Sequence, residues 1–455
     1  MQATSSVPLG PQTILFGDFL SALIQSLGEE GIRLHVLRNY EGFPANNNGR
    51  DLDLLIQRTE LARAIAALRS IQGIRIVGYA ERHYVASVLL AGVSMAHEAR
   101  AIQVDFYLTM TWKGIPYLRM DTLLQAVIPR RAGNLSFYVS DPVHEAIISL
   151  FSGLLLGGAL KEKYFPQAQQ TFAAARLEAI NNLRPQFGVK AATRLVDSVI
   201  EGDRSKVIAC VRPLRAALAL RSLRSPLLNS LNIARHYARE FAARLTPHDL
   251  ETVCMLGPSG ADTSAIVERL MPILQSTSVV VEKRDSGPRS SPVYQSPGIP
   301  LREDTYAKNR SRDSASSMNV LRWLLDEWLS QFFGKSLPTL RICESIYYDL
   351  LADPGSSSFS GPKWFLRLAG KLLPAADLWI LLEPCADGLQ SIGQKAPPIQ
   401  AAGQAAAYRS FIKTRNKYVI LDASKPPAVL AEDEYSAIIN ALAERADKQL
   451  KSRFK

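Results

Sequence analysis

Five short apolar runs, separated by segments of helical periodicity, follow one another from Leu250 onward. Runs that are apolar at successive positions are typical of strands buried on both faces of a parallel sheet. We therefore predict an α/β domain whose parallel sheet is covered by helices on both faces. The five runs are residues 252–256, 278–281, 340–343, 378–382 and 418–421.

The remainder of the chain shows two other patterns. Its first part mixes helix-period and strand-like segments, which indicates an α+β domain, and its middle part is almost wholly helical in pattern. The helical part starts at Asp141-Pro142, where Pro occupies a favourable first helical position. We predict an α+β domain over residues 1–140, a helical domain over 141–248 and the α/β domain over 249–455. In the first domain we expect a helix over 14–27 and strands over 34–37, 52–56 and 102–108.

Two aspartates two positions apart stand at the start of the apolar strand 52–56. Residues i and i+2 of a strand share a face, so Asp51 and Asp53 project together. A third aspartate, Asp105, lies inside the run 102–108, and two adjacent strands would bring all three carboxylates to one edge. Carboxylates held together repel one another unless a cation lies between them, and oxygen ligands suit Mg²⁺. We predict that Asp51, Asp53 and Asp105 bind Mg²⁺ and take part in catalysis.

Three segments surround these aspartates: LRNYEGFP at 37–44, GRDLD at 49–53 and VDF at 104–106. Together they resemble nucleotidyltransferase-fold proteins encoded among bacterial polysaccharide-synthesis genes. That superfamily places a Gly-Ser turn before its Asp-x-Asp strand, and in this chain Arg38-Asn39 stands there instead. The resemblance implies a nucleotidyltransferase-like domain that uses a nucleoside triphosphate. It assigns metal binding to Asp51 and Asp53, a role as ligand or base to Asp105, and nucleotide contacts to Arg38, Asn39 and Gly49.

A strand, a tight loop and a helix follow one another from Val253 to Ile266, the form of a phosphate-binding P-loop. The motif G-x-x-x-x-G-K-[ST] is altered, because Asp262 stands at the second glycine position and Thr263 at the lysine position. Two unit charges about 4 Å apart interact by roughly 4 kcal/mol at an effective dielectric of 20. Losing the attractive lysine and adding a repulsive aspartate therefore predicts weak ATP binding or none. The residues that we predict to contact nucleotide here are Gly257, Gly260 and Ser264.

Later segments of the same part carry a second resemblance. The sequences ICESIYYDLLADP at 342–354, GPKW at 361–364 and LPAADLWILL at 373–382 resemble thymidylate-kinase-like proteins. This resemblance implies a kinase-like P-loop fold. The Asp-Arg pair of that family is replaced at 344–345, and the cations of its lid are replaced at 392–395. These replacements remove the positive charges that phosphoryl transfer requires, so we predict a pseudokinase. The aromatic residues that we expect in its core are Tyr347, Tyr348 and Trp364.

The chain carries a net charge of +11, and much of the excess lies in residues 203–244. A basic stripe of this kind attracts phosphates or an anionic membrane surface, although no specific nucleic-acid module accompanies it. We find no signal-peptide pattern, and the four cysteines show no paired spacing, so we expect buried thiols in a reducing compartment. We predict a cytoplasmic protein, either free or peripheral to the inner membrane, where the stripe would contact polysaccharide-synthesis proteins or lipid.

Three functions stay open at this stage. The first is Mg²⁺-dependent transfer of a nucleotidyl group from a nucleoside triphosphate to a sugar-phosphate, lipid-carrier or protein acceptor, with an impaired kinase-like domain attached. The second is a non-enzymatic regulatory or scaffold protein built from two nucleotide-binding folds. The third is an atypical nucleotide or sugar kinase.

Overall fold

The computed structural model of the chain divides into two compact units. The first comprises Met1–Gly92, Ala96–Thr246 and Arg445–Lys455, and the second comprises Val93–Met95 and Pro247–Glu444. The helical segment predicted as a domain of its own, residues 141–248, falls almost wholly within the first unit. The residues that the structure describes are 16–43, 51–93, 101–223, 226–245, 251–257, 263–276, 280–286, 321, 324–325, 339–345, 362, 364–365, 368–369, 376–383 and 398–454.

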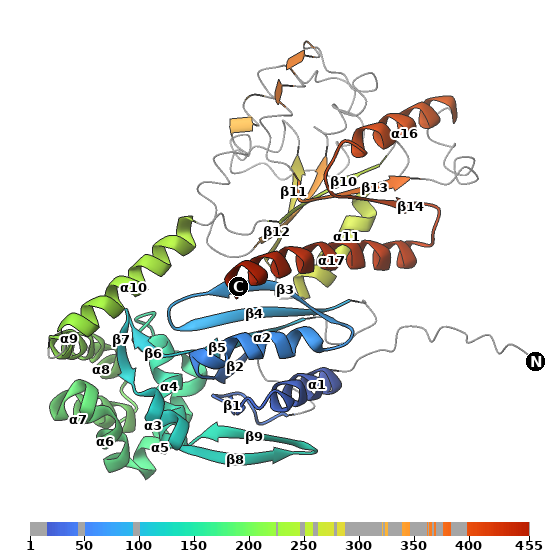
Figure 1. Cartoon of the computed structure of the whole chain (residues 1–455). Helices are drawn as coiled ribbons and strands as arrows, with labels where there is room; N and C mark the ends of the chain where they lie inside the picture. Colours follow the sequence, from blue (N-terminus) through green and yellow to red (C-terminus); the bar gives the residue numbers. More distant parts are fainter. Residues whose placement is uncertain are drawn as a thin grey trace, which may run out of the picture. The chain divides into compact units, whose positions relative to one another are not determined.

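A seven-stranded mixed sheet forms the centre of the first unit (Figure 1). Its central pair is parallel, and antiparallel neighbours flank it on both sides. The strands predicted at 34–37, 52–56 and 102–108 are confirmed, and they correspond to β1, β2 and β5. In order across the sheet the strands are β3 (Ile74–Glu81), β4 (Val85–Gly92), β5 (Ala101–Tyr107), β2 (Asp51–Leu55), β1 (His35–Val36), β9 (Leu135–Ser140) and β8 (Val127–Ala132).

Two groups of helices pack on this sheet. The predicted first helix is confirmed as α1 (Phe16–Glu29), which shares one core with α2 (Leu61–Ser70) and with apolar residues of the sheet. The second core contains the helices that follow the sheet in sequence. These helices are α4 (Pro142–Leu154), α5 (Phe165–Ala174), α6 (Arg176–Phe187), α7 (Val189–Ile200), α8 (Arg204–Ala209) and α9 (Val211–Ser222), and α10 (Pro226–Leu245) follows them.

The alternation of residues along β2 decides which side chains face which core. Leu52 and Leu54 are buried in the core of α1 and α2, whereas Leu55 is buried in the core of α4 to α9. Since successive strand residues point to opposite faces, Asp51 and Asp53 share the face of Leu55. The aspartates therefore lie on the side of the sheet that faces the helical segment.

The first helix of that segment begins as the sequence predicts. The carboxylate of Asp141 accepts hydrogen bonds from the backbone N–H groups of Val143 (3.0 Å) and His144 (3.1 Å). Pro142 occupies the first helical position, where no N–H is needed. The same carboxylate also contacts the His144 side chain. This cap fixes the start of α4, the helix that lies closest in sequence to the aspartate-bearing sheet.

A five-stranded parallel sheet forms the second unit, and each of its strands overlaps one of the five predicted apolar runs. The strand Val280–Ser286 overlaps its predicted run, 278–281, only at residues 280–281. The prediction of a parallel α/β sheet is confirmed. Tyr408 and Ile412 of α16 (Pro398–Ile412) pack on Cys254 in one core of this unit. The strands in order are β11 (Val280–Ser286), β12 (Thr339–Ser345), β10 (Glu251–Leu256), β13 (Leu378–Glu383) and β14 (Tyr418–Asp422), with helix α11 (Thr263–Ser276) after β10. The last helix is α17 (Pro427–Arg453), whose residues up to Glu444 belong to the second unit and whose later residues belong to the first.

Two expectations about side chains of the second unit have different outcomes. The thiols of Cys254 and Cys343 are buried, as expected. Trp364 is 66% exposed, so its prediction as a core residue is wrong. The adjacent Phe365 packs against the core instead, because only one of two neighbouring aromatic side chains can face inward there. The other two predicted core aromatics, Tyr347 and Tyr348, lie outside the described residues.

None of the helices in the described part of the chain combines the length and the apolar character that crossing a bilayer requires.

The cap of α4 yields a stability prediction. Replacing Asp141 by Ala removes two backbone contacts and the His144 contact, so the free energy of unfolding falls by about 1–2 kcal/mol. Asp141→Asn keeps an acceptor oxygen and costs less. Urea unfolding followed by circular dichroism measures both variants. The control is Asp121→Ala, an exposed residue without a capping contact among the described residues. Equal effects of Asp141→Ala and the control would contradict the capping role.

Candidate metal centre and adjoining cavity

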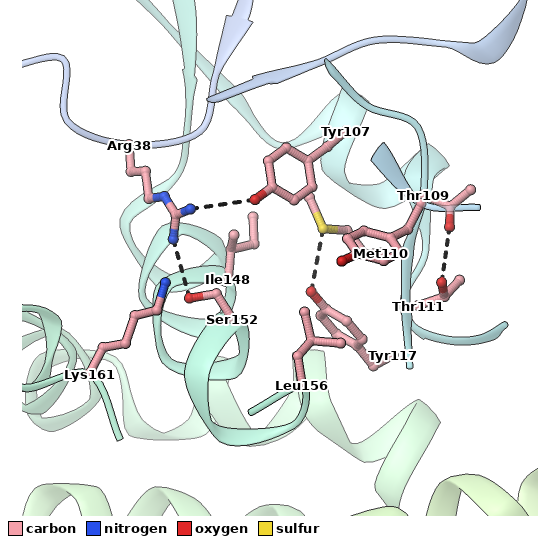
Figure 2. A pocket seen from close by; sticks show the side chains of 11 residues that line it. Arg38, Tyr107, Thr109, Met110, Thr111, Tyr117, Ile148, Ser152, Leu156 and Lys161 are labelled. Carbon is pink, nitrogen blue, oxygen red and sulfur yellow. Dashed lines mark hydrogen bonds between the residues drawn. The ribbon is translucent and has the colours of Figure 1, made fainter. Parts of the chain in front are cut away.

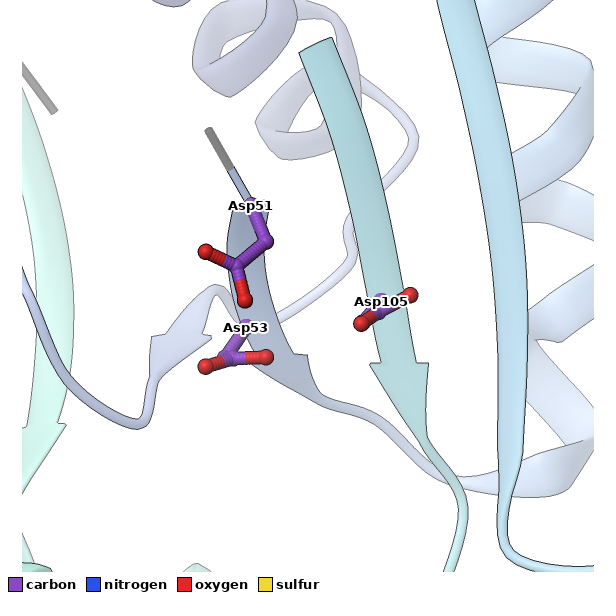
Figure 3. A group of neighbouring side chains, drawn as sticks. All are labelled: Asp51, Asp53 and Asp105. Carbon is purple, nitrogen blue, oxygen red and sulfur yellow. The ribbon is translucent and has the colours of Figure 1, made fainter. Parts of the chain in front are cut away.

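The three predicted aspartates lie together on neighbouring strands (Figure 3). β2 and β5 are parallel, and their register pairs Asp53 with Asp105. Asp51 stands two residues before Asp53 on the same face of β2. One carboxylate oxygen from each residue lies within 4.8 Å of the others. The expectation that two adjacent strands bring the three side chains to one place therefore matches the structure, and their roles as metal ligands stay a prediction.

Asp53 is the most buried member of the cluster, with 0% of the residue exposed. Burial raises the pKa of its carboxyl group, and the adjacent Arg38 guanidinium opposes that rise. Oδ2 accepts a hydrogen bond from Arg38 Nε, whereas Oδ1 receives none from any described residue. A buried acceptor without a partner costs about 1–3 kcal/mol, and more when the group is charged. The Oδ1 atom is therefore a strong candidate for a cation ligand.

Asp105 is half-buried and accepts its hydrogen bonds from neutral groups. Gln103 Nε2 donates to its Oδ1 over 2.9 Å, and the Ser87 hydroxyl also donates to it. Burial raises the pKa of the Asp105 carboxyl group, and these two hydrogen bonds oppose the rise. Ser87 lies opposite Asp105 on the neighbouring strand β4. The sheet itself thus orients this carboxylate beside Asp53.

Arg38 follows β1 and is held on several sides. Its side chain is 6% exposed and forms an ion pair with Asp53. Nη1 donates to Ser152 Oγ over 3.2 Å and Nη2 to the Tyr107 hydroxyl over 3.5 Å. The guanidinium also lies over the ring of Tyr164, 5.3 Å from its centroid. Burial opposes the charged form, but Asp53 raises the pKa of Arg38, so Arg38 is a fixed cation.

Asn39 completes the turn after Arg38. Its φ of 62° lies in the left-handed region, which asparagine tolerates better than most residues. The backbone N–H of Leu37 donates to the Asp53 carbonyl over 2.9 Å, so this turn is attached to β2 on one side. A nucleotide contact by the Asn39 side chain stays a prediction.

A cavity of about 100 Å³ adjoins Arg38 on the helical side of the sheet (Figure 2). Ser152 and Lys161 are among its polar lining groups, and Tyr107 and Tyr117 are among its aromatic ones. Binding sites for whole small molecules measure roughly 300–1,000 Å³. This cavity therefore suits a few water molecules or the end group of a ligand that extends beyond it.

The second predicted site is only partly described. Gly257 directly follows β10, and Ser264 is an exposed residue in the first turn of α11, so the predicted strand and helix are confirmed, whereas residues 258–262 between them lie outside the described residues. Gly260 lies outside the described residues, and so does Gly49, which was predicted to contact nucleotide in the first unit. Nucleotide contacts by Gly257, Gly260 and Ser264 stay a prediction.

Comparison with known proteins finds no family model and no curated protein that matches the chain. Among solved structures, the thymidylate kinase of Candida albicans is 16% identical with a TM-score of 0.29, over 42% of this chain and 92% of that protein. A gluconokinase from Sinorhizobium meliloti 1021 is 15% identical with a TM-score of 0.25, over 44% and 98%. The deoxyadenosine kinase from M. mycoides is 12% identical with a TM-score of 0.28, over 40% and 96%. At these TM-scores the similarities carry no conclusion about activity.

The buried ion pair can be tested by removing one or both of its charges. Arg38→Met leaves Asp53 buried and uncompensated, so the free energy of unfolding falls by about 3–5 kcal/mol. The double variant Arg38→Met/Asp53→Leu removes both charges and recovers most of that loss. Urea unfolding measures the three proteins. The control is Arg119→Met, which removes the exposed Arg119–Asp121 pair and changes stability by less than about 1 kcal/mol. A double variant no more stable than Arg38→Met would argue against the ion pair as the cause.

Proposed function

We propose that the first unit performs Mg²⁺-dependent nucleotidyl transfer from a nucleoside triphosphate, with Asp51, Asp53 and Asp105 as its metal-binding and catalytic residues. The observation that carries this proposal is the approach of three carboxylates to within 4.8 Å of one another on two parallel strands. It is supported by the buried Oδ1 of Asp53, which has no hydrogen-bond partner among the described residues.

Electrostatics favours a divalent cation at this place. The Arg38 guanidinium contacts Asp53, and it offsets one negative charge. Asp105 receives hydrogen bonds from neutral donors, which stabilise its charge only in part. The pKa of Asp53 and that of Asp105 are both raised by burial, so each carboxylate gains from a nearby positive charge. Mg²⁺ is bound by one or two carboxylates together with substrate phosphates, a requirement that this cluster meets.

Each residue has a separate part in the proposed reaction. Bound Mg²⁺ would supply charge stabilisation for the transferred phosphoryl group and alignment of the attacking hydroxyl. Asp51 and Asp53 hold the metal. Asp105 is a further ligand or the base that accepts the proton of the attacking hydroxyl, a role favoured by its raised pKa. Arg38 holds Asp53 in place and presents a fixed positive charge to the cavity.

The acceptor belongs to the proposal as well. The likeness to proteins of polysaccharide synthesis suggests a sugar phosphate, a lipid carrier or a protein. The second unit then serves as a kinase-like module with impaired phosphate binding, either as a scaffold or in regulation.

A second candidate is a non-enzymatic protein in which the aspartate cluster is structural. One observation favours it: the Arg38 guanidinium already contacts Asp53 Oδ2 and offsets the charge of that carboxylate. In that case the guanidinium replaces the metal, and the protein binds no divalent ion at the cluster.

Metal binding and turnover separate the two candidates. Titration calorimetry with Mg²⁺, with and without a non-hydrolysable nucleotide, measures binding, and pyrophosphate release from each common nucleoside triphosphate measures turnover. We expect Asp53→Asn and Asp51→Asn, which keep the shape of the side chain, to lower turnover by about 100-fold or more. The control Asp121→Asn changes an exposed carboxylate and leaves turnover unaltered. A wild-type protein that binds no Mg²⁺ and releases no pyrophosphate would support the structural candidate.

A further inference from the structure

A second charged cluster lies at the end of β3, where one buried carboxylate contacts three arginines. The Glu81 side chain is 8% exposed. Its Oε1 contacts Nη1 of Arg58 at 2.8 Å and Nη1 of Arg239 at 3.4 Å. Arg453 donates from Nε to Oε2 over 2.8 Å and from Nη2 to Oε1 over 3.0 Å. The Tyr79 hydroxyl donates to Oε2 over 2.9 Å.

The three arginines come from separate segments of the first unit. Arg58 opens the short 3₁₀ helix after β2, Arg239 belongs to α10, and Arg453 is the last residue of α17. Arg58 also donates from Nη2 to the His83 carbonyl over 2.7 Å, which fastens it to the turn between β3 and β4. The cluster is therefore held by hydrogen bonds to fixed backbone and to a buried acceptor.

This arrangement leaves a surplus of positive charge. One carboxylate offsets one guanidinium, and three guanidinium groups contact Glu81. The arginine side chains remain 39%, 37% and 48% exposed for Arg58, Arg239 and Arg453. Buried Glu81 thus holds the three side chains side by side while parts of them stay open to solvent.

Neighbouring titratable groups respond to this surplus. Burial lowers the pKa of His83, and the charges of Arg239 and Arg58 act in the same direction, so that the pKa is about 4. Burial also lowers the pKa of Arg239, with repulsion from Arg58 and Arg453 in the same direction. The rings of His83 and His236 lie 5.9 Å apart, and the buried Nδ1 of each has no hydrogen-bond partner among the described residues. Cations that repel one another are stabilised by a nearby anion.

We propose that Arg58, Arg239 and Arg453, held by Glu81, form a binding site for a phosphate group with two negative charges. Guanidinium groups bind phosphate oxygens through paired, charge-assisted hydrogen bonds. The two negative charges of the phosphate match the two positive arginine charges that the Glu81 carboxylate does not offset. The site does not depend on the aspartate cluster. Tyr84, from the same turn as His83, lines the cavity beside Arg38, so a phosphorylated ligand bound here lies at the end of the sheet that carries the cavity.

Binding of inorganic phosphate and pyrophosphate to the full chain, without Mg²⁺ and at low salt, tests this site. Titration calorimetry should detect binding to the wild type, and Arg58→Gln and Arg239→Gln should each weaken it by about 10-fold or more, because each removes a charged hydrogen bond. Arg176→Gln is the matched control: Arg176 is 45% exposed and pairs with Asp197, its one ion-pair partner among the described residues. Because the titration contains no Mg²⁺, a loss of binding in Arg58→Gln reports on this site and not on the proposed metal centre.

A second readout distinguishes binding from misfolding and identifies the source of the phosphate. In NMR titrations, a bound anion should raise the pKa of His83 and His236, and Arg58→Lys should retain that response in part. Vesicles containing phosphatidic acid, compared with pure phosphatidylcholine, test a lipid headgroup as the source. Binding to those vesicles alone assigns a lipid headgroup, and binding to the free anions alone assigns a soluble phosphate. No binding to either, or equal weakening in Arg176→Gln and Arg58→Gln, would overturn the proposal.

Discussion

The buried contact between Arg38 and Asp53 is the interaction on which the site of the first unit depends. It joins the turn after β1 to β2, and through Ser152 it reaches α4. Both partners are nearly inaccessible to water, so removing either one would leave an isolated charge in a medium of low polarity. The ion pair therefore couples the position of Asp53 to the packing of the helices against the sheet.

The aspartate cluster could be predicted from the sequence because it uses the simplest rule of strand geometry. Asp51 and Asp53 are two residues apart, and Asp105 lies inside an apolar run, so their shared face follows once β2 and β5 pair. The order of the second sheet could not be predicted, but its five strands could, since each contains consecutive apolar residues. Local patterns were sufficient for these elements.

The surroundings of the cluster could not be predicted in the same way. Ser152 lies 114 positions from Arg38 and Tyr107 lies 69 positions away, and no local pattern connects them. The arginines around Glu81 are spread further still, since Arg453 lies 372 positions from it. Trp364 illustrates a related difficulty, because we expected it in the core of a pseudokinase, whereas its neighbour Phe365 packs against the core and Trp364 is exposed. Contacts between distant segments are decided by the packing of the whole unit.

The two charged clusters of the first unit have excess charge of opposite sign. At the aspartates, carboxylates converge and one guanidinium contacts them. At Glu81, guanidiniums converge and one carboxylate holds them. In each cluster, a single group of opposite charge, Arg38 or Glu81, holds the like-charged side chains close together, where they can bind a partner of the opposite sign. Burial of that group strengthens its electrostatic interactions.

The last part of α17 belongs to the core of the first unit, and this has a consequence for how the protein folds during synthesis. Ala446 and Leu450, near the end of the chain, belong to the core that contains α1 and α2 near its start. The strands of the first sheet are therefore synthesised long before the last residues of that core. Early in synthesis this unit lacks part of its apolar core, and that core is completed only after residues 446–450 have been made.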